Sequence, residues 1–93
     1  MTMISKEDVL EATLAWARAE LAADDCGSVV RALYRATIGQ PRPLPASEQE
    51  AIDAARKELT AACDAGDEAF ERMKSVARQY VEEQAEPEAI AAS

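Results

Sequence analysis

A seven-residue repeat of apolar residues in the second half of the chain constrains the fold more than any other feature. Between Ser47 and Glu86, one apolar row recurs at intervals of seven, and a second row follows three residues later. The rows are Ile52, Leu59, Gly66, Met73, Tyr80 and Ala55, Ala62, Ala69, Val76. This spacing keeps apolar side chains on one face of a helix for about four heptads. The pattern predicts a long helix over about residues 48–85, on which the rest of the chain packs.

Gly66 lies in the middle of this predicted helix and leaves two interpretations. A helix can end at Gly66, with Asp67 capping a further helix, because glycine often follows a helix and aspartate is a good N-cap. The apolar rows cross Gly66 without a change of phase, and glycine inside a helix costs only about 1 kcal/mol relative to alanine. We expect a continuous helix, with a break at Gly66 as the alternative. At its start, Ser47 and Glu50 have the spacing of a capping box.

Two shorter helices are expected before the long one. Ser5 is a good N-cap for a helix over about residues 6–24, which carries two apolar faces and therefore predicts two neighbours. Glycine and capping residues in segment 24–28 predict a break, followed by a helix over about 29–38. Prolines at alternate positions predict an extended connector over 39–46. The two faces of the first helix are Leu10, Leu14, Ala17, Leu21 and Ala12, Ala15, Ala19, Ala22, Ala23.

The expected fold is all-α, a small bundle of three to four helices with a long C-terminal helix and a proline-rich extended connector. Residues 1–86 form one helical domain in this prediction. Pro87 ends the last helix, and residues 87–93 are expected to be a disordered acidic tail. A chain of 93 residues is long enough for one small domain.

The composition limits how large a core this domain can have. Alanine supplies 21 of the 93 residues, whereas leucine, isoleucine, valine and phenylalanine together supply 16. Alanine favours helices but fills little volume. Two outcomes follow: helices that pack very closely through alanine faces, or apolar stripes that a second chain covers. The alanine faces and the heptad rows make a self-associating, antitoxin-like structural module, a homodimer, one functional alternative.

Charge and cysteine content exclude some partners and indicate a compartment. The formal net charge is −8, and binding to nucleic acid or to an anionic membrane needs a net basic surface. We therefore expect neither as a direct partner. With no signal-like segment and two cysteines, we expect a cytoplasmic protein with reduced thiols. Cys26 and Cys63 are then interpreted as small buried side chains, with a disulfide between them as the less favoured alternative.

The chain offers little catalytic chemistry. It contains no histidine and no glycine-rich loop, which removes histidine-based nucleophile activation, mixed Cys/His zinc sites and phosphate cradles. Carboxylates are the remaining candidates. Glu68 with Glu71, and Glu50 with Asp53, have a spacing that could hold Mg²⁺ only if the acids pointed into a bundle. A Mg²⁺-dependent nucleotide pyrophosphohydrolase is thus a remote alternative, and we expect no enzyme activity, metal or cofactor.

An acidic stripe on the long helix and one tryptophan are the candidate partner-binding residues. The stripe, which consists of Asp64, Asp67, Glu68 and Glu71, has no base within it. Such a stripe serves solubility, or it attracts a basic surface on another protein. Trp16 lies off the leucine face, as the edge of a core or as an anchor for a partner.

These features lead to a functional hypothesis. The sequence favours a non-enzymatic protein-binding module, an acidic inhibitor or accessory factor that binds a basic surface of nucleic-acid-handling machinery. Because basic surfaces often bind phosphates, a small acidic protein can block them as a decoy. Anti-CRISPR and anti-restriction proteins of phages and other mobile elements provide the analogy, and the hypothesis rests on analogy only.

Overall fold

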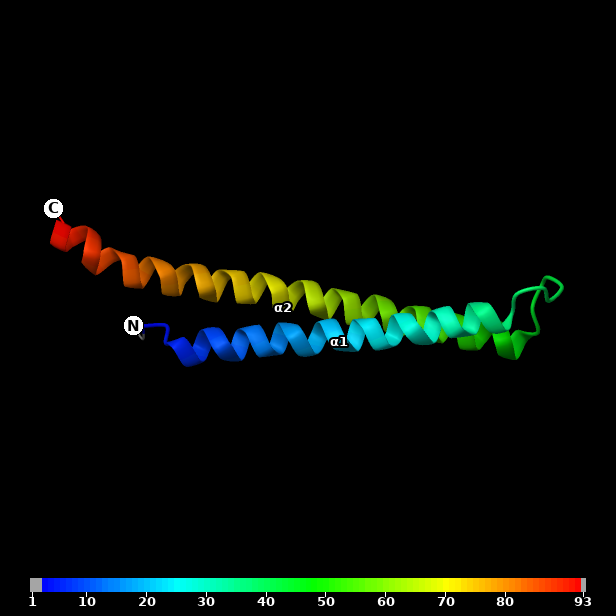
Figure 1. The fold of residues 1–93 in the computed structure, drawn as a ribbon. Coiled ribbons are helices and arrows are strands. Elements are labelled where there is room, and N and C mark those ends of the chain that lie inside the picture. The colour runs from blue at the N-terminus through cyan, green and yellow to red at the C-terminus, as the bar shows by residue number, and fades with distance from the viewer. Residues whose placement is uncertain (1–2, 93) are drawn as a thin grey trace.

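The protein is an elongated helical hairpin. The computed structural model describes residues 3–92, and the side chains of residues 3–84. Two antiparallel helices, α1 (Lys6–Ala36) and α2 (Ala46–Ala92), lie side by side and are joined at one end by a short connector (Figure 1). The rod measures 73 × 22 × 16 Å. The fold is all-α, but the predicted bundle of three to four helices is wrong, because the chain has two long helices.

The predicted break at residues 24–28 does not exist, and this accounts for the missing helices. Gly27 is helical and buried inside α1. The Arg31 guanidinium folds across it, with Nη1 3.3 Å from the point where a Cβ would stand. Local sequence signals for a helix end are weak when packing continues on both sides. Here α1 packs against α2 before and after Gly27, so the helix continues.

The heptad rows of α2 form its contact face with α1, and α2 runs through Gly66 without a break. Every position of the two rows is buried or half-buried. The rows therefore pack against α1 of the same chain, as a two-helix coiled-coil seam requires. Helix α1, together with its C-cap Thr37, presents a matching pair of rows with the same spacing. These rows are Val9, Trp16, Ala23, Val30, Thr37 and Ala12, Ala19, Cys26, Leu33.

The leucine face of α1 packs against no other helix. Leu10, Leu14 and Leu21 are 59%, 45% and 64% exposed. The alanine-rich face contacts α2 instead, because its small side chains continue the seven-residue spacing of the seam while the leucines lie on the opposite side. The expectation of two neighbours for this helix is therefore wrong: α1 has one neighbour, and one apolar face remains at the surface.

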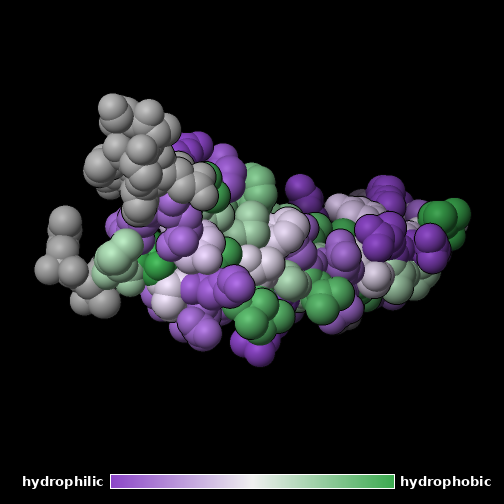
Figure 2. Space-filling view, turned by 60° about the vertical axis from the view of Figure 1, so that its left-hand side comes forward, coloured by the Kyte–Doolittle hydropathy of each residue, from purple (hydrophilic) through white to green (hydrophobic). Residues whose placement is uncertain are grey.

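The core is thin, as the composition indicates. Among residues 3–84 no large side chain is completely buried, and the buried hydrophobic residues are Ala12, Val30, Leu44, Ile52 and Ala55. Figure 2 shows the result, with hydrophobic side chains at the surface between hydrophilic ones. Within the same part of the chain, no helix has the length and apolar character that crossing a membrane requires.

The start of α1 is the predicted one. Ser5 is the N-cap: its Oγ accepts a hydrogen bond from the backbone N–H of Asp8 at 3.1 Å, and Asp8 Oδ2 accepts one from the N–H of Ser5 at 2.9 Å. The backbone N–H of Ser5, and then its hydroxyl, lower the pKa of Asp8 below 3.8. The contribution of Asp8 to stability is therefore present above pH 3.8 and is lost as the pH falls through the lowered pKa.

The start of α2 differs from the prediction. The helix begins at Ala46, and the carbonyl of Pro45 accepts hydrogen bonds from the N–H groups of Glu48 and Gln49, both at 3.0 Å. Ser47 consequently lies inside the first turn, and the predicted capping box of Ser47 with Glu50 is wrong. The proline carbonyl already provides the first helical acceptor, so no side-chain cap is needed at Ser47.

The connector is non-helical, as its prolines predict, but it bends at Arg42 and Pro43 instead of running extended, and it ends at Pro45 because α2 begins at Ala46. The chain turns after α1 at Gly39, whose φ of 82° is in the left-handed region. Leu44, later in the connector, is buried, with 7% of its surface exposed. At the opposite end of the rod, the N–H of Ile4 donates a hydrogen bond of 2.9 Å to Glu83 Oε2 and ties the start of the chain to α2. The predicted tail 87–93 lies outside the residues whose side chains the structure describes.

Gly66 and Gly39 should respond in opposite ways to substitution by alanine. Gly66→Ala should raise the free energy of unfolding by about 0.5–1 kcal/mol, because alanine is the better helix former. Only Glu20 Oε1 lies near the added methyl, at 3.3 Å, and this exposed carboxylate can move away. Gly39→Ala should lower stability by about 1–2 kcal/mol, since its backbone is left-handed. Thermal melts followed by circular dichroism should move in opposite directions; a lower melting temperature for Gly66→Ala would show that Glu20 is fixed.

Candidate functional site

The four predicted acids occupy the side of α2 that faces away from α1. Asp64, Asp67, Glu68 and Glu71 are all exposed. They lie on the side of the helix opposite its inward-facing rows, and they fall together because residues three, four and seven apart share one side of an α-helix. The structure therefore brings all four together along one edge, which we call the acidic stripe.

Most of the charge in the acidic stripe is uncompensated. The only side-chain ion pair within residues 3–84 joins Lys74 Nζ to Glu71 Oε1 at 3.1 Å. Both side chains are well exposed, so this contact adds little to stability. Asp64, Asp67 and Glu68 have no cation at ion-pair distance in the described part of the chain. Three neighbouring carboxylates of the acidic stripe are thus exposed without an ion-pair partner in this part of the chain.

Trp16 packs inside the hairpin and connects to the end of the acidic stripe. Its ring centroid lies 5.6 Å from that of Phe70, with an angle of 46° between the ring planes. Lys74 Nζ lies 4.9 Å from the centroid of Phe70 and pairs with Glu71 on its other side. Trp16 is half-buried. This intramolecular contact accounts for its position, and its role in binding a partner remains a prediction.

A groove between the helices adds two acids that the sequence did not indicate. Glu20 and Asp24 of α1 line it together with Asp67 of α2, and one cation, Arg31, is also present. The groove is about 330 Å³ in volume. Arg31 Nη2 donates a hydrogen bond of 3.2 Å to Ser28 Oγ. The acidic surface therefore extends from α2 across the seam to α1, which only the pairing of the two helices could reveal.

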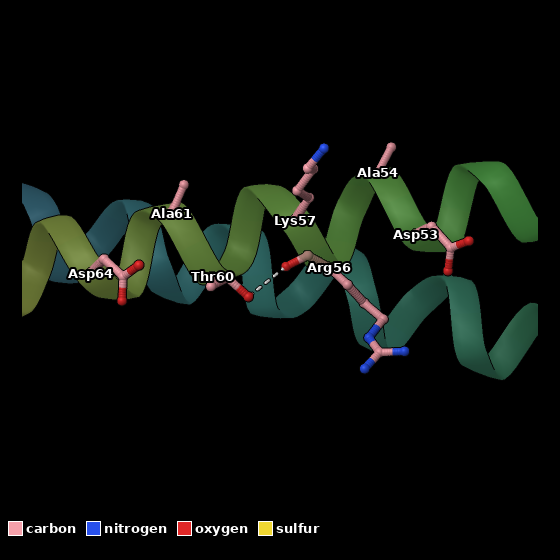
Figure 3. A pocket seen from close by; sticks show the side chains of 7 residues that line it. All are labelled: Asp53, Ala54, Arg56, Lys57, Thr60, Ala61 and Asp64. Atoms are coloured by element: carbon pink, nitrogen blue, oxygen red, sulfur yellow. Dashed lines mark hydrogen bonds between the residues drawn. The ribbon is translucent and has the colours of Figure 1, made fainter.

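The hollow beside the N-terminal part of the stripe is too open to enclose a small molecule. Figure 3 shows that its lining side chains come from α2 alone and project from the helix in different directions. Thr60 Oγ1 donates back to the carbonyl of Arg56 at 3.1 Å. A site formed by one helix cannot surround a ligand. The lining residues are Asp53, Ala54, Arg56, Lys57, Thr60, Ala61 and Asp64.

A second cavity lies at the connector end, between the two helices. It has a volume of about 260 Å³ and is lined mainly by small and apolar side chains, among them Leu33 and Ile52. Glu48 also lines it, and its Oε2 is buried without a hydrogen-bond partner among the described residues. The side-chain amide of Gln40, which also lines the cavity, donates a hydrogen bond of 3.1 Å from Nε2 to the carbonyl oxygen of Ala36. A single buried oxygen without a hydrogen-bond partner is not enough to identify a ligand for this cavity.

The other predicted chemistry does not assemble in the described residues. No group of three or more histidine, cysteine, aspartate or glutamate side chains there has the geometry of a metal site. Cys26 and Cys63 are not bridged; Cys26 is half-buried in the seam, whereas Cys63 is exposed, so its expected burial is wrong. Comparisons with known protein families, with curated proteins and with solved structures returned no match for this chain.

Proposed function

We propose that this protein is a non-enzymatic binding module that uses the acidic stripe of α2 to bind a basic surface on another protein. In this proposal it acts as an inhibitor or accessory factor of nucleic-acid-handling machinery. The observation that carries the proposal is the row of exposed carboxylates, three of them without an ion-pair partner among residues 3–84, on a helix whose inner face packs against α1. Glu20 and Asp24 reinforce the negative charge across the seam.

The spacing of the stripe suits a phosphate-binding surface. A helix rises about 1.5 Å per residue, so Asp64 and Glu71 are about 10 Å apart along the axis. Successive phosphates of one DNA strand are about 3.4 Å apart along the axis, so the stripe covers the length of about three of them. The hairpin packs the inner face of α2 against α1, so the carboxylates are presented with little loss of backbone freedom on binding. The module would then occupy a basic groove in place of nucleic acid.

Neutralising the acidic stripe should weaken capture of the partner at least tenfold. The variant carries Asp64→Asn, Asp67→Asn, Glu68→Gln and Glu71→Gln. The matched control carries Glu50→Gln, Asp53→Asn, Glu58→Gln and Glu82→Gln, so each changes the net charge from −8 to −4. Exposed charge contacts contribute about 0.2–1 kcal/mol each, and four of them account for this loss. The measurement is quantitative pull-down from a bacterial lysate at low salt, with the captured proteins identified by mass spectrometry.

The control separates a specific site from general acidity. The proposal expects the control to capture the same basic protein as the wild type, and it expects capture to fall as salt is added. Equal loss in both variants would show that net charge alone is responsible. Capture of no protein by the wild type at low salt would contradict the proposal itself.

A further inference from the structure

The leucine face of α1 is an apolar surface that the hairpin leaves uncovered. Leu10, Leu14 and Leu21 follow one another at helical spacing, with half-buried Ala17 between them. All three leucines are at least 45% exposed. They lie on the side of α1 opposite the seam, so α2 cannot reach them. Isolated leucines at a surface are ordinary, but a continuous row of them indicates an interaction surface.

We propose that a second copy of this chain covers the leucine face, with the two α1 helices antiparallel. The alignment that places Leu10 of each copy against Leu21 of the other also places Leu14 against Ala17. All six leucines of the pair are then buried together. The contact is isologous, as expected for a twofold homodimer.

The charges beside the leucine face select this arrangement. Glu11 and Arg18 lie on the same edge of the face, seven residues apart, and both are exposed. In an antiparallel pair, residues on the same edge face each other across the interface, as they do in antiparallel coiled coils. The proposed alignment therefore places Glu11 of each copy against Arg18 of the other, which gives two ion pairs by symmetry.

The alternative alignments lose these ion pairs. In a parallel pair, the edge that carries Glu11 and Arg18 faces the opposite edge of the partner helix, so Glu11 and Arg18 do not meet. A shift of the antiparallel pair by one heptad places Glu11 against Glu11 or Arg18 against Arg18, according to its direction. Opposed like charges disfavour the wrong register more strongly than the correct pairs stabilise the right one. Beyond the leucines, Glu7 of one copy would face Asp24 of the other. Because both are acids, the contact between the two copies ends there.

The dimer would leave the acidic stripe accessible. The stripe lies on the outer side of α2, and α2 lies on the far side of α1 from the leucine face. The two copies would form a row of four helices with one acidic stripe at each outer side. The proposal does not depend on the function of the stripe, and it gives the leucine face a use of its own.

A charge swap in the full-length protein tests both the interface and its register. Glu11→Arg and Arg18→Glu, made singly, each replace two attractions by two repulsions and should raise the dimer dissociation constant about tenfold or more. The double variant restores both pairs with reversed polarity and should return the constant to near the wild-type value. Sedimentation equilibrium measures the constant, and circular dichroism checks that each variant remains helical.

Each outcome decides the proposal. Dimerisation of the wild type, weakening in both single variants and recovery in the double variant support it. A wild type that is monomeric at all accessible concentrations overturns it. A dimer that tolerates the single changes overturns the interface, and failure of the double variant to recover overturns the antiparallel register. Leu21→Lys, which changes a side chain that is 64% exposed in the monomer, should abolish the dimer without unfolding the hairpin.

Discussion

Ile52→Ala should lower the free energy of unfolding by about 2–5 kcal/mol, the range for removing a buried large aliphatic side chain. Ile52 is 3% exposed, and it lines the cavity at the connector end with Leu33 and Thr37. The hairpin has few other bulky buried side chains to close around the gap. Because small domains have only about 5–15 kcal/mol of net stability, a large part of the protein should unfold at moderate temperature.

The matched control for this change is Val81→Ala. Val81 lies on the same helix and is 61% exposed, so its truncation should change stability by no more than about 0.5 kcal/mol. Urea unfolding followed by circular dichroism at 222 nm gives both values. Similar midpoints for the two variants would show that Ile52 is not part of the core that holds the helices together.

Trp16→Ala should have the second largest effect, a loss of about 2–3 kcal/mol. Truncation of a fully buried tryptophan costs about 3–5 kcal/mol, and half-buried Trp16 should cost less. Its contact with Phe70, at a centroid distance of 5.6 Å, is an edge-tilted aromatic pair of the kind that adds about 0.5–1.5 kcal/mol. Trp16→Phe keeps an aromatic pair and should lose about 1 kcal/mol or less.

The same two variants separate the structural role of Trp16 from a partner-binding role. Trp16 is the only tryptophan in the chain, so its fluorescence in the wild type reports the state of the seam during unfolding. Trp16→Phe should stay folded and can therefore be used for partner capture. Unchanged capture would remove Trp16 from the binding site, whereas unchanged stability in Trp16→Ala would show that its contact with Phe70 does not hold the helices together.

The sequence predicted the inner face of α2 because that face obeys a strict register. The prediction failed for α1 because large apolar side chains were given more weight than the seven-residue spacing. The leucine face was expected to be buried, whereas the observed seam contains small and polar residues such as Ala23 and Thr37. The pattern around Gly27 also fits a helix end when it is considered locally. Only the continuation of the seam on both sides explains why α1 does not stop there.

The candidate site was predictable where it depends on one helix and unpredictable where it depends on two. Helical phase alone places the four acids of the stripe on a single edge of α2. The addition of Glu20 and Asp24 depends on which face of α1 meets α2, and that face was predicted wrongly. The unpartnered oxygen of Glu48 also results from the way the connector end closes, which no periodicity describes.

The distance along the chain between facing residues increases steadily from the connector to the open end. Near the connector, the helices meet through residues close in sequence and bury Val30 and Ile52. At the other end, Ile4 reaches Glu83 across 79 positions. Closing a longer segment costs more chain entropy, and no side chain among residues 67–84 of α2 is buried to the extent that Ile52 is. The two helices should therefore separate first at the end that holds the termini. The acidic stripe lies between the part that separates readily and the part that stays closed.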